Sequence, residues 1–195
     1  GMVALLFAIP IICALIGIVW GIDILSADKA QDIVAGHVLT GIGLVCTSLV
    51  ALVASVVRQI QNTYSETDRR FWPWLVIVMG TIDILWGLYL LIFQYSPVTI
   101  APGFVLIGLG IVCYSILSKV LLLALVWRHP YPLAKRIPLI PVLTALICLF
   151  IAAFLFEAAT SNPAYMVPAR VMVGLGGICF TLFSIVSILE SGTSS

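Results

Sequence analysis

Long runs of apolar residues, separated by short polar connections, dominate the pattern along the chain. A helix that crosses the hydrocarbon core of a bilayer needs about 20 such residues, and six runs reach this length. They cover residues 3–25, 34–57, 72–93, 101–127, 137–159 and 168–189. The runs are continuous, whereas strands of a membrane barrel alternate over about 10 residues. We therefore predict an all-α polytopic membrane protein with six transmembrane helices.

The composition agrees with this prediction and limits the kinds of partner that the protein can bind. Hydrophobic residues make up 63% of the 195 residues and charged residues 9%, whereas a soluble domain has about 25% charged residues. We expect a single transmembrane domain over residues 1–195, with the lipid bilayer as its environment. A net charge of +1 excludes a nucleic-acid partner, which requires a clustered basic surface. Gly1 precedes the first methionine, so the chain could be a fragment of a longer protein.

The distribution of basic residues predicts the orientation. Cytoplasmic loops carry an excess of Lys and Arg. The second and fourth connections together hold six basic residues, and the other side holds two: Arg58, Arg69, Arg70, Arg128, Lys135 and Arg136, against Lys29 and Arg170. We therefore expect both termini to lie in the cytoplasm.

An internal repeat groups the spans in pairs. The second, fourth and sixth spans share a run of small residues that ends at a cysteine, and these cysteines lie 67 and 66 residues apart (113 − 46 and 179 − 113). We predict three tandem helical hairpins over about 3–58, 71–127 and 137–190. Parallel repeats of this kind are related by an axis along the membrane normal, so we expect pseudo-threefold symmetry.

The small residues of the repeat predict a helix-packing face. Steps of seven and three residues keep them on one side of each helix. They are Gly36, Gly43, Cys46, Gly103, Gly110, Cys113, Ala169, Gly176 and Cys179. Small residues let helix backbones approach closely in lipid, so plain packing is the favoured interpretation. The alternative is that this face lines a pore or a substrate cavity.

Several segments carry a family resemblance. The motif Val-Ala-Gly-His-Val-Leu at 34–39, the segments at 113–116, 118–120 and 122–128, and the long closing segment at 179–190 resemble the YhiM-type bacterial inner-membrane family. The likeness runs from about Pro10 to Glu190 and matches the three C-terminal hairpins of longer family members. The resemblance implies an inner-membrane location and an association with survival at low pH, and it implies no chemistry.

Two ionisable residues within spans are candidates for function. A charged group at the bilayer centre costs roughly 2.5–3.5 kcal/mol on insertion scales, so such residues are functional hypotheses by default. Asp83 lies eleven residues from Trp72, and Lys119 lies eight from Trp127. At about 1.5 Å per residue their depths differ by only about 5 Å. We predict that Asp83 and Lys119 form an intramembrane ion pair, which is either a proton or solute site or a structural bridge.

A second set of charged residues is expected at the outer rim. Asp23 ends the first span and His37 opens the second, and Asp28 and Asp32 lie between them. Because imidazole titrates near pH 6.5, this cluster is a candidate sensor of external acidity. Glu157 and Arg170 occupy the same relation in the third hairpin. The alternative for both pairs is a structural clasp that holds a hairpin shut.

Motifs for catalysis, cofactors and metals are not found in the sequence. It lacks a phosphate-binding loop, a nucleophile elbow and a His-Glu-x-x-His zinc motif. The five cysteines all fall within spans, away from the aqueous compartments in which disulfides form. We expect free thiols, no cofactor, no metal and no enzymatic activity.

Two functions therefore remain open. One is an inner-membrane channel or facilitator for a small solute or a proton, associated with acid resistance. The other is a non-transporting stress-adaptation protein that self-associates or binds partner membrane proteins through its small-residue faces. A conduit needs a polar or hydrated path to Asp83, whereas a packing protein needs a dry centre.

Overall fold

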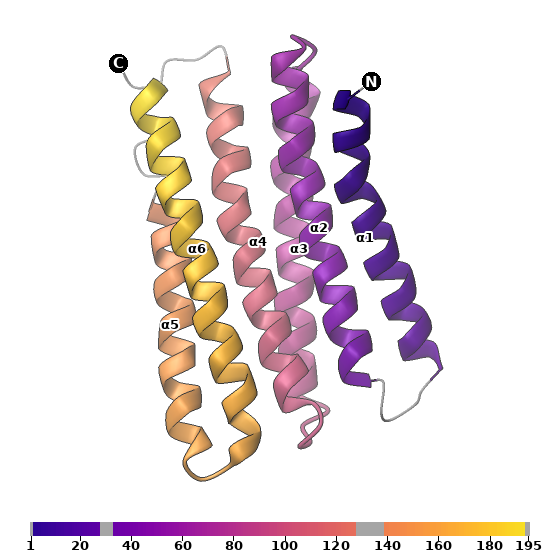
Figure 1. The fold of residues 1–195 in the computed structure, drawn as a ribbon, viewed down its shortest axis with the longest axis vertical. Coiled ribbons are helices and arrows are strands. Elements are labelled where there is room, and N and C mark those ends of the chain that lie inside the picture. The colour runs from indigo at the N-terminus through magenta and orange to yellow at the C-terminus, as the bar shows by residue number, and fades with distance from the viewer. Residues whose placement is uncertain (1, 28–32, 128–138, 194–195) are drawn as a thin grey trace.

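Six long helices make up the protein (Figure 1). The structure, a computed structural model, describes residues 2–27, 33–127 and 139–193. The helices are α1 (Met2–Ser26), α2 (Ile33–Ile60), α3 (Glu66–Ile92), α4 (Ile100–Val126), α5 (Leu139–Ala159) and α6 (Met166–Thr193), and a short 3-10 helix, η3 (Pro163–Tyr165), precedes α6. All six are long and apolar enough to cross a membrane, and the described residues contain no strand. The predicted all-α, six-span architecture is confirmed.

The third helix begins earlier than its apolar run. Hydropathy places the start near Trp72, whereas α3 begins at Glu66. Ser65 adopts an extended conformation, and its backbone N–H donates to Asp68 Oδ2 at 2.9 Å. This is the return bond of a capping box, which satisfies a donor at the helix start. Polar capping therefore adds nearly two turns to the apolar span.

The helices pair as three antiparallel hairpins, α1–α2, α3–α4 and α5–α6. The start of α1 and the end of α6 lie at the same end of the bundle, together with the connection between α2 and α3 (Figure 1). We call this the terminus end. The connection between α3 and α4 and the segment that contains η3 lie at the opposite end.

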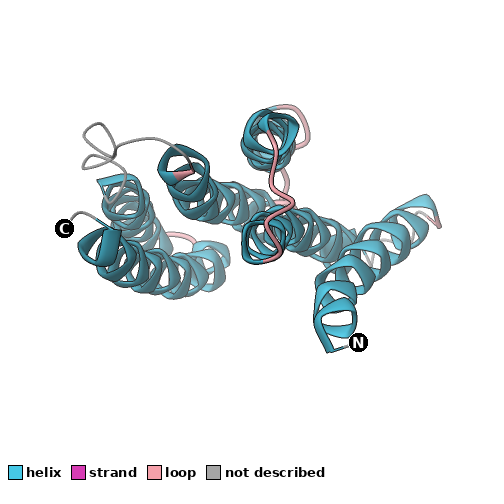
Figure 2. Ribbon diagram, turned by 90° about the horizontal axis from the view of Figure 1, so that it is seen from above, coloured by secondary structure: helices cyan, strands magenta, loops and turns pink. Residues whose placement is uncertain are grey.

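The hairpins are arranged in a row and not around an axis. α4 packs against α2, α3, α5 and α6, whereas α2 and α6 form no comparable interface in the described part of the chain. Seen from above, the bundle is elongated and open (Figure 2). Over its membrane window α4 is 72% buried and α1 only 17%. The arrangement therefore departs from the predicted pseudo-threefold symmetry, because α4 fills the centre instead of sharing it with α2 and α6.

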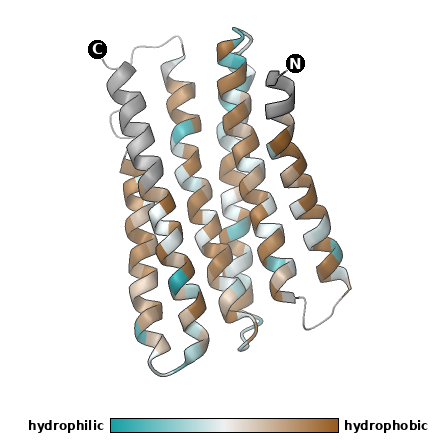
Figure 3. Ribbon diagram, in the orientation of Figure 1, coloured by the Kyte–Doolittle hydropathy of each residue, from teal (hydrophilic) through white to brown (hydrophobic). Residues whose placement is uncertain are grey.

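The outer faces of the helices are apolar (Figure 3). On α1 the exposed side chains include Ile12, Leu15, Ile16 and Val19, each more than half exposed. In water such a surface would be an aggregation hazard, whereas in a bilayer it is the ordinary lipid contact. The buried cluster instead centres on α4, with Val105, Leu109, Ile116 and Val120 among its members.

Candidate functional site

The carboxyl group of Asp83 is the most unusual feature of the interior. Asp83 lies on α3 and is 0% exposed. Cys113 Sγ of α4 is 4.0 Å from Asp83 Oδ2, at the limit for a thiol hydrogen bond. Asp83 Oδ1 has no hydrogen-bond partner within the described residues. A buried carboxyl group with an unpartnered oxygen is rare in folded proteins and calls for a specific explanation.

Three helices enclose this carboxyl group closely. Gly41 of α2 covers it, since a Cβ built on Gly41 would lie 3.3 Å from Asp83 Oδ1. The same Cβ would meet Leu106 at 2.5 Å and Leu109 at 3.0 Å, both from α4. The nearest atoms of Leu106 and Leu109 are the ends of apolar side chains. Gly41 therefore brings the backbone of α2 close to the Asp83 carboxyl group, which lies among apolar side chains of α4.

The predicted ion pair between Asp83 and Lys119 is not formed. No salt bridge joins the two residues, both of which the structure describes. Asp83 lies level with Cys113, and Lys119 is six residues further along α4, about 9 Å along the helix axis. The prediction measured the depth of Asp83 from Trp72 and the depth of Lys119 from Trp127, on the assumption that the two tryptophans lie at the same depth in the membrane. The actual register is set by Gly80, which packs against Cys113.

The outer-rim pair Asp23–His37 is also not formed. Their heights agree with the prediction, because Gly36 packs on Leu25 and Gly21 on Thr40. Asp23 points to the exposed surface, whereas the buried ring of His37 packs edge-on against Trp86 of α3, with centroids 5.4 Å apart. His37 Nδ1 has no partner in the described part of the chain. Asp28 and Asp32, the other predicted members, lie outside the described residues.

The clasp predicted between Glu157 and Arg170 is likewise absent. Both side chains are exposed, and the ion pairs found among the described residues do not include them. In this hairpin Gly176 lies against Cys148 and Leu149. In that register Arg170 of α6 lies opposite a part of α5 that precedes Glu157 by about one helical turn. The two side chains therefore lie at different depths.

The small-residue face packs within each hairpin. Gly43 meets Gly17, and Gly110 meets Gly80 and Ile84, so both glycines contact the first helix of their own hairpin. The repeat cysteines reach further. Cys113 faces Asp83 of its own hairpin and also interacts with Ser48 of α2, and Cys179 interacts with Cys148 of its own hairpin and with Ser115 of α4. The buried Ala169 and the glycines at 36, 103 and 176 complete the set. The face therefore joins helices closely and does not line a central channel in this conformation.

The described residues contain no group of three or more His, Cys, Asp or Glu side chains placed to hold a metal ion. Of the repeat cysteines, Cys46 is only partly buried, and Cys113 and Cys179 are buried.

A polar cluster at the terminus end was missed by the sequence reasoning. Arg58 Nε of α2 donates to Asp68 Oδ2 of α3 at 2.7 Å, and Trp72 Nε1 donates to Asp68 Oδ1 at 3.0 Å. Burial and the nearby Asp68 carboxylate raise the pKa of Tyr64 to about 12. The pattern Ser65-x-x-Asp68 is a recognisable capping signature, so part of this cluster was predictable.

The comparisons with known proteins agree on one family. The family described as "Protein of unknown function (DUF2776)" matches residues 1–194. The chain is 51% identical over 190 residues to "Inner membrane protein YhiM" of Escherichia coli (strain K12), an alignment that covers 97% of this chain and 54% of that protein. The chain thus spans about half the length of the curated relative it matches. No solved structure matches. With residues 1–194 matched by the family and about half of the aligned residues shared with YhiM, the predicted resemblance is confirmed, and this six-helix chain belongs to the DUF2776 family.

Proposed function

We propose that this chain belongs to an inner-membrane facilitator that passes protons, or a small solute together with a proton, under acid stress. Asp83 is the group that gains and loses the proton. In this proposal the protein has no enzymatic role, and the structure corresponds to the closed state. Both termini lie in the cytoplasm, because the terminus end carries Arg58, Arg69 and Arg70 and basic residues favour that side.

The single observation that supports the proposal is the fully buried, half-satisfied carboxyl group of Asp83. An ionised carboxylate in the bilayer centre costs roughly 2.5–3.5 kcal/mol, and no basic side chain of the described residues forms an ion pair with Asp83 to offset that cost. The group is therefore stable here only while it carries its proton. Loss of the proton requires water or a counter-charge to reach it, so deprotonation is coupled to opening of the α2–α3–α4 contact.

The groups that face Asp83 are few, which simplifies the titration. From α4 the titratable neighbour is Cys113, at 4.0 Å. On the side of α2 the Asp83 carboxyl group is covered by Gly41. Cys46, also of α2, interacts with Cys113. His37 lies one helical turn away, since it precedes Gly41 by four residues on α2 and packs against Trp86, three residues after Asp83 on α3. Among the described residues no ion pair joins Asp83 to Lys119. In this proposal the proton step at this depth is therefore assigned to Asp83, with Cys113 as the titratable group in contact.

The inner-membrane location is supported by the name of the relative in Escherichia coli, and the acid-stress role by the resemblance to the YhiM-type family. The relative is about twice as long as this chain. The proposal therefore concerns the six-helix unit, and the substrate of a complete protein is part of the proposal.

Proton flux into proteoliposomes tests this function. Vesicles loaded with a pH-sensitive dye receive an external acid pulse, with potassium and valinomycin to balance charge. Wild-type protein and Asp23→Asn, the exposed-carboxylate control, are expected to acidify the lumen faster than empty vesicles. Asp83→Asn, which is nearly isosteric and always neutral, is expected to fall to the empty-vesicle rate. Equal flux through wild type and Asp83→Asn would contradict the proposal.

A second function is favoured by a different observation. The centre of the bundle is filled by α4, and glycine backbones touch directly within the hairpins. Such packing suits a non-transporting protein that self-associates or holds partner membrane proteins. This function predicts flux no higher than empty vesicles for all three proteins and chemical cross-linking of the wild type into a defined oligomer.

A further inference from the structure

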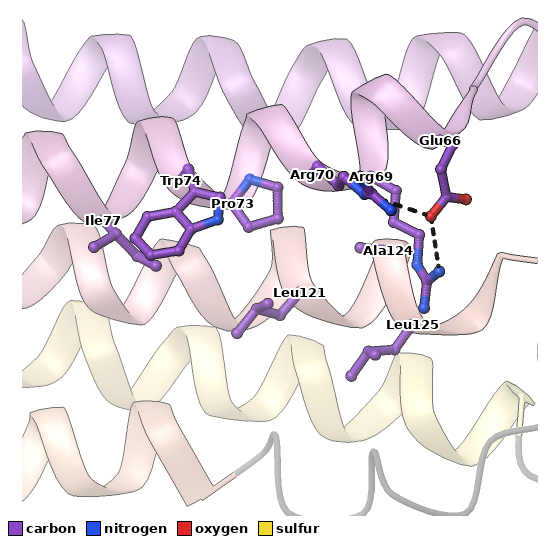
Figure 4. Close-up of a pocket in the computed structure, with 9 residues that line it drawn as sticks. All are labelled: Glu66, Arg69, Arg70, Pro73, Trp74, Ile77, Leu121, Ala124 and Leu125. Atoms are coloured by element: carbon purple, nitrogen blue, oxygen red, sulfur yellow. Dashed lines mark hydrogen bonds and ion pairs between the residues drawn. The ribbon is translucent and has the colours of Figure 1, made fainter.

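A groove at the terminus end is lined by charged side chains at one end and by apolar side chains at the other. It lies between α3 and α4 and has a volume of about 460 Å³. Its upper part is formed by Glu66, Arg69 and Arg70, in the first turns of α3 (Figure 4). Its deeper part is apolar and is formed by Pro73, Trp74, Ile77, Leu121, Ala124 and Leu125. A ligand that fits this lining has a charged end and an apolar end.

The charged end of the groove favours an anion. Arg69 Nη1 lies 3.2 Å from Glu66 Oε1, and Arg70 Nε lies 3.9 Å from the same oxygen. Two guanidinium groups therefore share one carboxylate oxygen, which leaves a local charge of +1. Each guanidinium has five N–H donors, so most donors of this pair remain available. Their fork geometry suits the oxygens of a phosphate.

Exposure and depth place this pair at a membrane surface. The side chain of Arg70 is 80% exposed, and Trp74, one turn deeper, is 66% exposed. Exposed tryptophans of membrane proteins concentrate at the headgroup level. From Glu66 to Ile77 the helix rises about 16 Å, which is enough for a headgroup and the first part of an acyl chain.

We propose that this groove binds an anionic phospholipid, with its phosphate on Arg69 and Arg70 and an acyl chain along Trp74, Ile77 and Leu121. The charge of +1 matches a phosphate diester of charge −1. A zwitterionic lipid has no net charge, so the local charge of +1 attracts it less strongly than an anionic lipid, even where its ammonium group approaches Glu66. Glu66 positions both guanidinium groups in the empty groove and competes with the phosphate for them.

Native mass spectrometry of the detergent-solubilised full chain tests the proposal. The probes are phosphatidylglycerol, phosphatidylethanolamine and soluble glycerophosphate, each titrated separately. We expect wild-type protein to retain phosphatidylglycerol in preference to the other two. Near a membrane surface each arginine contributes about a fivefold affinity change, so Arg69→Gln with Arg70→Gln should weaken phosphatidylglycerol binding roughly thirtyfold.

Two further variants separate this site from general lipid contact. Arg170→Gln removes one exposed arginine at the opposite end of the bundle and should leave phosphatidylglycerol binding unchanged. Glu66→Gln removes the competing carboxylate and should tighten binding severalfold. The proposal is overturned if the double variant retains phosphatidylglycerol as wild type does, if both lipids bind equally, or if glycerophosphate binds as tightly as the lipid. Because Glu66, Arg70 and Arg170 are exposed and Arg69 is only partly buried, folding of the variants is checked by thermal unfolding and is expected to be unchanged.

Discussion

The contact between Gly87 and Gly103 gives a quantitative test of hairpin packing. A Cβ added at Gly87 would lie 2.5 Å from the carbonyl oxygen of Gly103 and 3.0 Å from the backbone N of Ile107. Ordinary van der Waals contact begins at 3.4 Å, so the shortfall at the carbonyl is 3.4 − 2.5 = 0.9 Å. Both obstacles are backbone atoms. Gly87→Ala therefore forces α3 and α4 apart and cannot be relieved by a rotamer change.

The expected cost follows from two opposing effects. Overpacking of a close contact costs about 1–3 kcal/mol, whereas Gly→Ala in a helix gains up to about 1 kcal/mol in intrinsic propensity. Gly174 of α6 provides the matched control, because a Cβ there meets nothing within 4 Å. The difference in unfolding free energy between Gly87→Ala and Gly174→Ala isolates the packing effect, and we expect about 1–3 kcal/mol.

The assay is reversible unfolding in mixed micelles, followed by tryptophan fluorescence. Gly174→Ala should be as stable as wild type or slightly more stable, and Gly87→Ala should be the less stable of the two variants. If Gly87→Ala matches Gly174→Ala, the close backbone approach is not needed for the hairpin, and the role assigned to the glycine repeat fails.

Two further predictions concern the terminus end. Asp68→Ala removes the capping bond to Ser65 and the partner of Arg58 and Trp72, so the same unfolding assay should show a loss of about 2 kcal/mol. Glu157→Ala, at an exposed site, should change stability by less than about 0.5 kcal/mol, and equal effects of the two substitutions would refute a stabilising role for the polar cluster around Asp68. The pKa of Tyr64 is about 12 in the folded protein, and that of an unfolded tyrosine is about 10. The neutral phenol of Tyr64 therefore stabilises the folded state fully below about pH 10, and this stabilisation is lost as the pH rises through 12. The measurement is the absorbance of tyrosinate followed against pH. Compared with wild type, Tyr64→Phe should lack the part of the absorbance increase that occurs at the highest pH, and identical titration curves of the two proteins would argue against burial of the Tyr64 phenol.

The sequence was sufficient for the architecture because the bilayer constrains it so strongly. Apolar runs of span length fold as helices in lipid, and the repeat spacing indicates the hairpins. The glycine face was also predictable, since Gly43 and Gly110 do mediate close approach. The start of α3 was misjudged because hydropathy does not report polar capping residues such as Ser65 and Asp68.

The pairing of ionisable residues was not predictable, for two physical reasons. Register between α3 and α4 is set by where Gly80 meets Cys113, so depth counted from tryptophans failed for Asp83 and Lys119. Rotation is the second reason. Sequence separation along a hairpin predicts the height of a side chain but not the neighbouring helix that it faces, so His37 was placed at the correct height but on the wrong side, since its ring packs on Trp86 of α3.

The central claim is that the buried Asp83 carboxyl carries a proton while the bundle is closed. Infrared difference spectroscopy of wild type against Asp83→Asn at neutral pH measures this directly. The account predicts the carbonyl band of a protonated carboxylic acid in wild type that is missing from Asp83→Asn and retained in Asp23→Asn. A wild-type difference spectrum that shows the bands of an ionised carboxylate instead would contradict it.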